Sequence, residues 1–112
     1  MAKVVISAAL KEQIEKKFKA ESIEIFSLLD ALRSNPKKGQ VIGAVGNVII
    51  KELKYKKFRF YFIADRYQII FRSVEELKDL LIKVVRMSEK KDQQKTIDEI
   101  KVILRNLGEQ GF

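Results

Sequence analysis

The chain has 112 residues, enough for one domain whose core holds one sheet and a few helices. Its 23 lysines and arginines outnumber 15 aspartates and glutamates, and the formal charge of +8 favours an anionic partner, either nucleic acid or an acidic protein segment. Histidine and cysteine are both absent, which excludes imidazole catalysis, disulfides, thiolate nucleophiles and His-containing metal sites. We therefore expect no metal and no cofactor.

No apolar run reaches the roughly 18 residues that a membrane-spanning helix needs, so we expect a soluble protein. The first six residues lack the pattern of a secretory signal, which predicts a cytoplasmic location. Abundant Lys, Glu and Ile, with no Trp and a single Pro, favour a thermophilic source.

The first third of the chain predicts a strand followed by two helices. A strand is expected over residues 3–6, and Ser7 is a suitable N-cap for a helix over residues 8–20. A second helix is expected over residues 22–33, antiparallel to the first, and Asn35-Pro36 should end it because a residue before proline avoids the helical conformation.

The middle of the chain predicts a β-hairpin over residues 48–65, VIIKELKYKKFRFYFIAD. The preceding GQVIGAVG lacks the Gly-Lys-Ser/Thr ending of a phosphate-binding loop, so we interpret it as turn residues leading into the hairpin. A four-residue tip pairs Lys54 with Arg59, and strand alternation then gives the hairpin one apolar face. The other face is the candidate site, and it carries Glu52, Lys54, Arg59 and Tyr61.

The last third predicts two short segments, a strand and a helix. Residues 67–71 are expected to form a strand, and a capping box at Ser73 should open a short helix through Leu80. Residues 81–85 form an apolar strand, and a second capping box at Thr96 opens a helix that ends at Gly108. The predicted fold is a single α+β domain over residues 1–112, with a mostly antiparallel sheet of about four strands, an N-terminal helical hairpin on one face and a C-terminal helix.

This order of elements resembles the RelE/ParE superfamily of toxin–antitoxin proteins, and most of all the RelE/HigB-like mRNA interferases. The resemblance covers nearly the whole chain and rests on short motifs, which are Asn35-Pro36 followed by Gly39, Glu52-Leu53-Lys54, Phe58-Arg59, Lys90-Lys91 and Lys95-Thr96. It implies a RelE-like fold and a toxin that enters the ribosome and cuts mRNA there. In that reaction the 2′-hydroxyl attacks the adjacent phosphate. The implied partners are mRNA on the ribosome, with contacts to rRNA, and a cognate acidic antitoxin.

The resemblance also implies roles for individual residues. Arg59 matches the arginine that contacts the scissile phosphate, and Lys54 beside it is a candidate base. Tyr61 either stacks on a base or only packs. Arg86 stands where the family has a histidine or an arginine, although strand parity groups it with the apolar residues of its own strand and leaves its access to the groove open. Four lysines are candidate RNA-binding residues: Lys56, Lys57, Lys90 and Lys91.

Other interpretations of the same residues remain open. Arg59 and Tyr61 could be an exposed pair on the sheet, the lysines at the hairpin tip could be a solvated end, and Phe58, Phe60 and Phe62 are interpreted as core. The alternative functions are a ParE-like inhibitor of DNA gyrase, which performs no chemistry, and a catalytically degenerate RNA-binding member of the superfamily.

Overall fold

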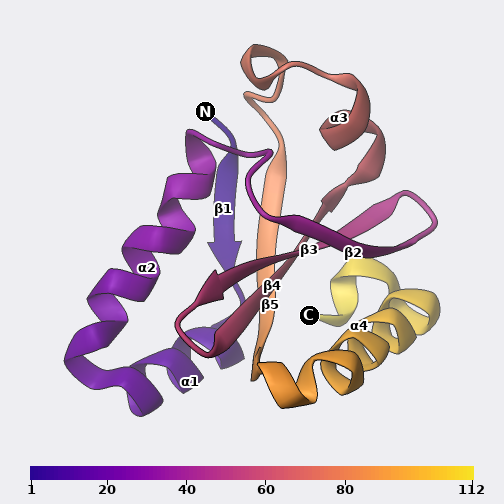
Figure 1. Ribbon diagram of the computed structural model, residues 1–112. Helices are drawn as coiled ribbons and strands as arrows, with labels where there is room; N and C mark the ends of the chain where they lie inside the picture. The colour runs from indigo at the N-terminus through magenta and orange to yellow at the C-terminus, as the bar shows by residue number, and fades with distance from the viewer.

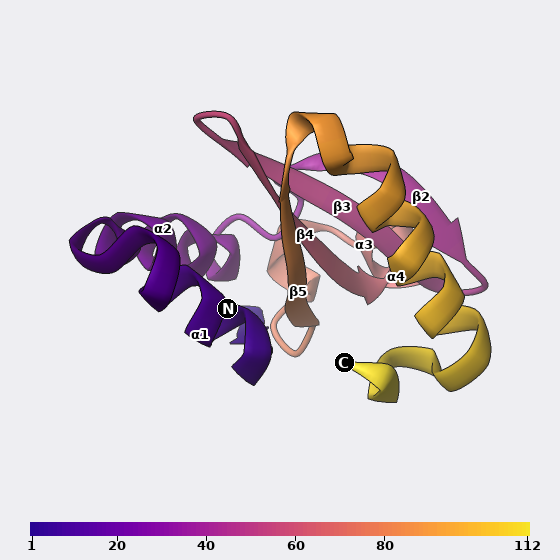
Figure 2. The same cartoon turned by 90° about the horizontal axis from the view of Figure 1, so that it is seen from below.

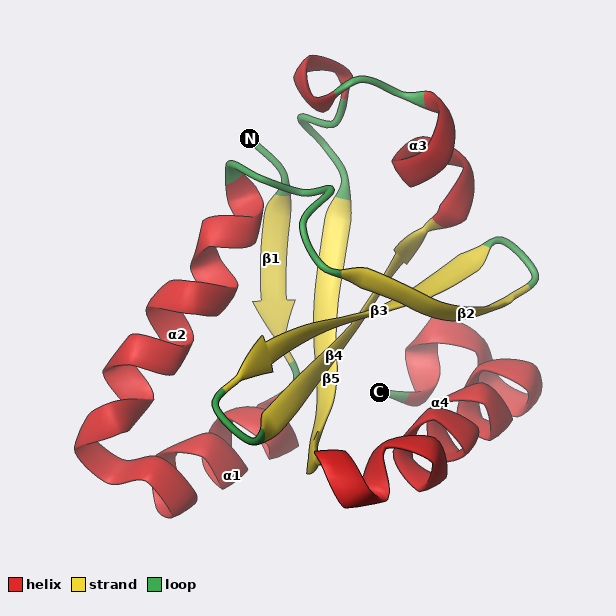
Figure 3. Ribbon diagram, in the orientation of Figure 1, coloured by secondary structure: helices red, strands yellow, loops and turns green.

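The structure is a computed structural model that describes residues 1–112. One sheet of five strands lies between a pair of N-terminal helices and a C-terminal helix (Figures 1 and 3). The strands are β1 (Lys3–Ile6), β2 (Gln40–Val45), β3 (Val48–Tyr55), β4 (Phe58–Asp65) and β5 (Leu81–Glu89). The helices are α1 (Ala8–Phe18), α2 (Ser22–Asp30), α3 (Arg66–Phe71) and α4 (Gln93–Leu107).

The strands lie in the order β1-β5-β4-β3-β2. Strand β1 runs parallel to β5, and every other neighbouring pair is antiparallel. Helices α1 and α2 form the expected helical hairpin around a 3₁₀ turn, Lys19–Glu21, and Ser7 caps α1 by accepting a hydrogen bond from the Leu10 amide at 3.4 Å. The predicted α+β fold class is confirmed.

Helices cover both faces of the sheet, as the view from below shows (Figure 2). We call the two sides the α1–α2 face and the α4 face. On the α1–α2 face 17 buried residues form one cluster, which includes Phe58, Phe60 and Phe62 as expected. On the α4 face a second cluster of 7 buried residues joins Tyr61 and Ile63 to α4. The sheet therefore separates two apolar cores, where the sequence suggested one.

The sheet has five strands where we expected about four, and the GQVIGAVG segment contains one of them, β2. Gly43 lies in this strand opposite Ile50, and a Cβ there would stand 3.0 Å from the side chain of Lys101 on α4. The end of the Lys101 side chain therefore lies close over the glycine. The expected turn is wrong at Gly43, because the turn before β3 lies at Gly46 and Asn47.

Residues 67–71 form helix α3 and not the strand that their β-rich composition predicts. The Asp65 side chain accepts a hydrogen bond from the Gln68 amide at 3.0 Å, and this N-cap outweighs the strand propensity. After it, the capping box at Ser73 opens only a 3₁₀ turn, Val74–Glu76. Helix α4 begins at Gln93, three residues before the predicted capping box, so Thr96 is buried within the helix.

No helix combines the length and the apolar character needed to cross a membrane.

Candidate functional site

The β3–β4 hairpin has the register that the sequence predicts. Lys54 lies opposite Arg59, Leu53 opposite Phe60, and Glu52 opposite Tyr61. Leu53 and Phe60 belong to the cluster on the α1–α2 face. Because side chains alternate along a strand, Lys54 and Arg59 share the opposite face, where α4 packs.

A β-bulge brings Arg86 to the same face. Tyr61 of β4 pairs with Arg86, but the next residue, Phe62, pairs with Val84, so Val85 is an extra residue in β5. Simple alternation would have placed Arg86 with Val84 on the α1–α2 face. The bulge reverses this parity. All four candidate catalytic residues therefore stand on the α4 face, a placement that alternation alone could not give.

Arg59 is a buried cation without a carboxylate partner. Its side chain is only 7% exposed, and its guanidinium donates a hydrogen bond to the Phe58 carbonyl at 3.2 Å. It takes part in none of the ion pairs in the structure, all of which lie elsewhere. Its remaining guanidinium nitrogens make no hydrogen bond within the protein, and none of them is fully enclosed, so they can still bond to an anion. Arg59 is not the exposed residue of the alternative interpretation.

Tyr61 is completely buried beneath α4 and presents no surface on which a base could stack. Its hydroxyl lies 2.8 Å from the Ser88 hydroxyl on β5. Burial is the main cause that raises the pKa of Tyr61 above its usual value, while the hydrogen bond with Ser88 acts in the opposite direction. The phenol therefore stays protonated at neutral pH, and Tyr61 packs in this conformation of the protein.

Glu52 is the acidic member of the site and is held by α4. It is 3% exposed, and its carboxylate accepts a hydrogen bond from the Gln93 side chain at 2.7 Å. Gln93 is the first residue of α4, so this bond ties the start of the helix to the middle of β3. Lys54 is two residues further along β3, is exposed and forms no ion pair.

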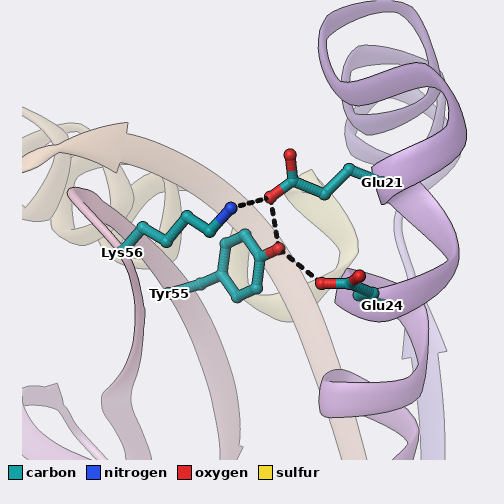
Figure 4. Close-up of polar contacts among 4 residues, drawn as sticks. All are labelled: Glu21, Glu24, Tyr55 and Lys56. Atoms are coloured by element: carbon teal, nitrogen blue, oxygen red, sulfur yellow. Dashed lines mark hydrogen bonds and ion pairs between the residues drawn. The ribbon is translucent and has the colours of Figure 1, made fainter.

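The lysines at the hairpin tip are already engaged with carboxylates. Lys56 lies 2.7 Å from Glu21, and the Tyr55 hydroxyl donates a hydrogen bond to Glu21 and lies 3.1 Å from Glu24 (Figure 4). The bond to Glu21 is the main cause that raises the pKa of Tyr55 above its usual value. We call this group of four residues the tip clasp, since it fastens the hairpin to the beginning of α2.

On the other side of the tip, Lys57 lies 3.1 Å from Glu89 and Lys91 lies 3.5 Å from the same carboxylate. The hydrogen bond from Lys57 is the main cause that lowers the pKa of Glu89. Lys90 is exposed and forms no ion pair. RNA that binds Lys56, Lys57 or Lys91 must therefore compete with a carboxylate, which costs little because exposed ion pairs are weak.

Arg86 reaches the α4 face, but its side chain turns towards the end of the chain. Its guanidinium carbon lies 5.1 Å from the centre of the Phe112 ring, and one nitrogen donates to the Val85 carbonyl at 2.8 Å. The last turn, residues 108–112, thus covers Arg86 with an aromatic ring in a cation–π contact.

Sequence reasoning missed Ser88, Gln93 and Phe112. Ser88 lies opposite Arg59 only because the bulge sets the β4–β5 register. Gln93 could have been considered if the start of α4 had been placed correctly, since polar side chains in the first turn of a helix often bond to neighbouring segments. No local signal marks Phe112. Its contact with Arg86 depends on how the chain folds back after α4.

Two shallow grooves border the site. A groove of about 330 Å³ beside Lys54 is lined by residues of α2, of β3, and of β2 and the segment just before it, among them Lys38, Gln40 and Glu52. A second, of about 230 Å³, lies beyond Ser88 and includes Lys17 and Asp92. The site thus offers cations and hydroxyls close to open surface, which suits an anionic chain more than a small apolar ligand. Comparisons with protein families, with curated proteins and with solved structures found no match to this chain.

Proposed function

We propose that the protein is a RelE-like toxin that cleaves mRNA on the ribosome in the cytoplasm, and that a cognate acidic antitoxin neutralises it. The observation that carries the proposal is the buried guanidinium of Arg59, which has no acidic partner and lies opposite Lys54 on one face of the sheet. The formal charge of +8 supports an anionic partner.

The proposed cleavage reaction needs only a few functional groups from the protein. The 2′-hydroxyl of a nucleotide loses its proton and attacks the adjacent phosphorus, and the 5′-oxygen of the next nucleotide leaves with a proton, so a 2′,3′-cyclic phosphate remains. Arg59 stabilises the charge on the phosphate oxygens in the transition state, because its planar fork matches two oxygens at once. In this proposal Lys54, which lies opposite Arg59, takes the proton from the hydroxyl.

The other candidate residues have supporting roles in this proposal. Tyr61 stays protonated and holds the hydroxyl of Ser88, the residue that lies opposite Arg59. Arg86 adds positive charge to the same face. Lys56, Lys57, Lys90 and Lys91 contact the RNA backbone, of the message or of rRNA, around the site.

The test is translation of a defined mRNA in a cell extract, with 5′ ends mapped by primer extension. We expect cuts that need ongoing translation and that fall about a hundredfold in Arg59→Ala, the size of effect seen when one group that stabilises transition-state charge is removed. Arg105→Ala is the matched control, because it removes an exposed arginine from the far end of α4. Cuts that persist unchanged in Arg59→Ala would contradict the proposal.

A non-catalytic function is the second candidate, and the burial of Tyr61 favours it, since a fully covered phenol cannot meet a substrate. A degenerate member of the superfamily would bind RNA or the ribosome without producing new 5′ ends. A ParE-like inhibitor would instead block supercoiling by purified DNA gyrase. Primer extension and the gyrase assay are run on the same preparation. New 5′ ends indicate the nuclease, blocked supercoiling indicates the inhibitor, and neither effect is expected from the RNA-binding member.

A further inference from the structure

Helix α3 exposes an unusual amount of apolar surface for its length. It has six residues, of which only Ile69 is buried. Four apolar side chains of α3 and the turn after it are open to solvent, with exposed fractions of 56% for Tyr67, 49% for Ile70, 71% for Phe71 and 44% for Val74. Figure 1 shows α3 beyond the end of β4, away from the other helices. Single exposed apolar residues are ordinary, but a contiguous group marks a binding surface.

The aromatic members of this group form a pair. Tyr67 and Phe71 are one helical turn apart, and their ring centres lie 5.1 Å from each other with the planes tilted by 42°. More than half of each side chain faces solvent. The two rings thus support one another and leave their outer surfaces free.

An arginine stands on each side of the pair in the sequence. Arg66 precedes Tyr67 and Arg72 follows Phe71, and neither takes part in an ion pair. Asp65 caps α3, and Glu76 accepts the Ser73 amide at 2.9 Å. Hydrogen bonds from Ser73, and then the charge of Arg72, lower the pKa of Glu76. The segment therefore combines exposed aromatic rings with two arginines that form no direct ion pair.

We propose that α3 is a stacking platform for single-stranded nucleic acid, with bases on Tyr67 and Phe71 and phosphates at Arg66 and Arg72. Aromatic rings beside cations are the combination with which proteins bind single strands without reading their sequence. Arg59 and Asp65 are six residues apart on β4, which is about 20 Å in a strand, so the platform is separate from the candidate cleavage site. The proposal does not depend on cleavage.

Two other occupants fit less well. A stable contact between two copies of the chain takes about 20–30 residues on each side, and this surface offers four apolar side chains. Helices that lie on membranes present an apolar face several turns long, whereas α3 has fewer than two turns. Neither alternative uses both the paired rings and the neighbouring arginines.

The test is the binding of fluorescently labelled ten-nucleotide oligouridylate and oligoadenylate, followed by anisotropy. We expect Tyr67→Ala and Phe71→Ala each to weaken binding about tenfold, within the range known for loss of one stacking ring. Tyr67→Phe and Phe71→Tyr keep a ring and should bind like the original protein. Leu107→Ala removes a side chain that is 65% exposed on α4 and should have no effect.

Ultraviolet cross-linking to the same oligouridylate, followed by peptide mapping, locates the contact, and adducts on Tyr67 or Phe71 are expected. Those adducts should persist in Arg59→Ala, even if that change abolishes cleavage, so the platform and the nuclease can fail separately. Unchanged affinities in both alanine variants, with cross-links only elsewhere, would overturn the platform. So would alanine variants that bind the oligonucleotides normally but lose self-association in sedimentation or binding to vesicles of phosphatidylserine and phosphatidylcholine.

Discussion

On the α1–α2 face the sheet buries a continuous apolar cluster, whereas on the α4 face a smaller apolar cluster shares the surface with charged and hydroxyl groups. The two faces use the same strands, since Phe60 points to one side and Arg59 and Tyr61 to the other. The α1–α2 face mainly stabilises the fold. On the α4 face polar groups occupy part of the area that apolar side chains could fill, and every candidate catalytic residue lies there.

The largest expected effect tests this division directly. Phe60→Ala removes a fully buried ring from the larger cluster and should lower the free energy of unfolding by about 3–5 kcal/mol. Ile100→Ala, at a fully buried position of α4, should lower it by about 2–4 kcal/mol. Urea denaturation gives both values. A larger loss from Ile100→Ala than from Phe60→Ala would show that α4 is the main stabilising element, and the comparison of the faces would fail.

A smaller effect is expected where α4 meets the polar part of its face. Gln93→Ala removes the hydrogen-bond donor of the buried Glu52 carboxylate and should lower the free energy of unfolding by about 1–3 kcal/mol. Gln94→Ala is the matched control, because the neighbouring amide bonds only to the exposed Asp98 and should contribute less than about 0.5 kcal/mol. Equal losses of unfolding free energy in the two variants would mean that water, and not Gln93, supplies the hydrogen bond that the Glu52 carboxylate needs.

The smallest effect concerns the hairpin tip, which has an ion pair on each side. Hydrogen bonds, first from Lys56, lower the pKa of Glu21, and Lys57 does the same for Glu89. A carboxyl whose pKa is lower in the folded protein stabilises it above the unfolded pKa, about 4.3, and this stabilisation disappears as the pH falls through the folded value. Glu21→Gln should therefore flatten the loss of stability below pH 4.3.

Glu89→Gln should reduce the loss of stability at acidic pH by less than Glu21→Gln does, because Glu21 holds the Tyr55 hydroxyl as well as a lysine. Urea midpoints at pH 7 and pH 3 measure both changes. Glu12→Gln is the control, since Glu12 belongs to an exposed pair within α1. A stronger effect from Glu89→Gln would place the main anchor of the tip on β5 instead of on the tip clasp.

The elements that the sequence predicted well are those set by alternation and by local caps. The pairing of Lys54 with Arg59 follows from the length of the tip, and the three phenylalanines of β4 lie in the core because every second residue does. Ser7 starts α1 through a contact only three residues away. Such features depend on neighbours in the chain, so a single sequence contains the information.

The elements that escaped prediction depend on distant segments. Strand β2 exists because β3 offers it an edge, although its glycines look like a loop. The position of Arg86 depends on Val85, an extra residue that only the pairing with β4 reveals. At the candidate site, the sequence placed Lys54, Arg59 and Tyr61 on one face. It could not show that α4 buries Tyr61.

The parallel pairing of β1 with β5 also affects how the protein is made. Lys3 is synthesised long before its partner Leu81, and β2, β3 and β4 lie between them in the chain. Long-range pairing of this kind is slow, and β4 likewise lacks its β5 neighbour until then. The register that sets Arg86 opposite Tyr61 therefore forms only after β5 has been synthesised, so the α4 face depends on pairing between distant segments.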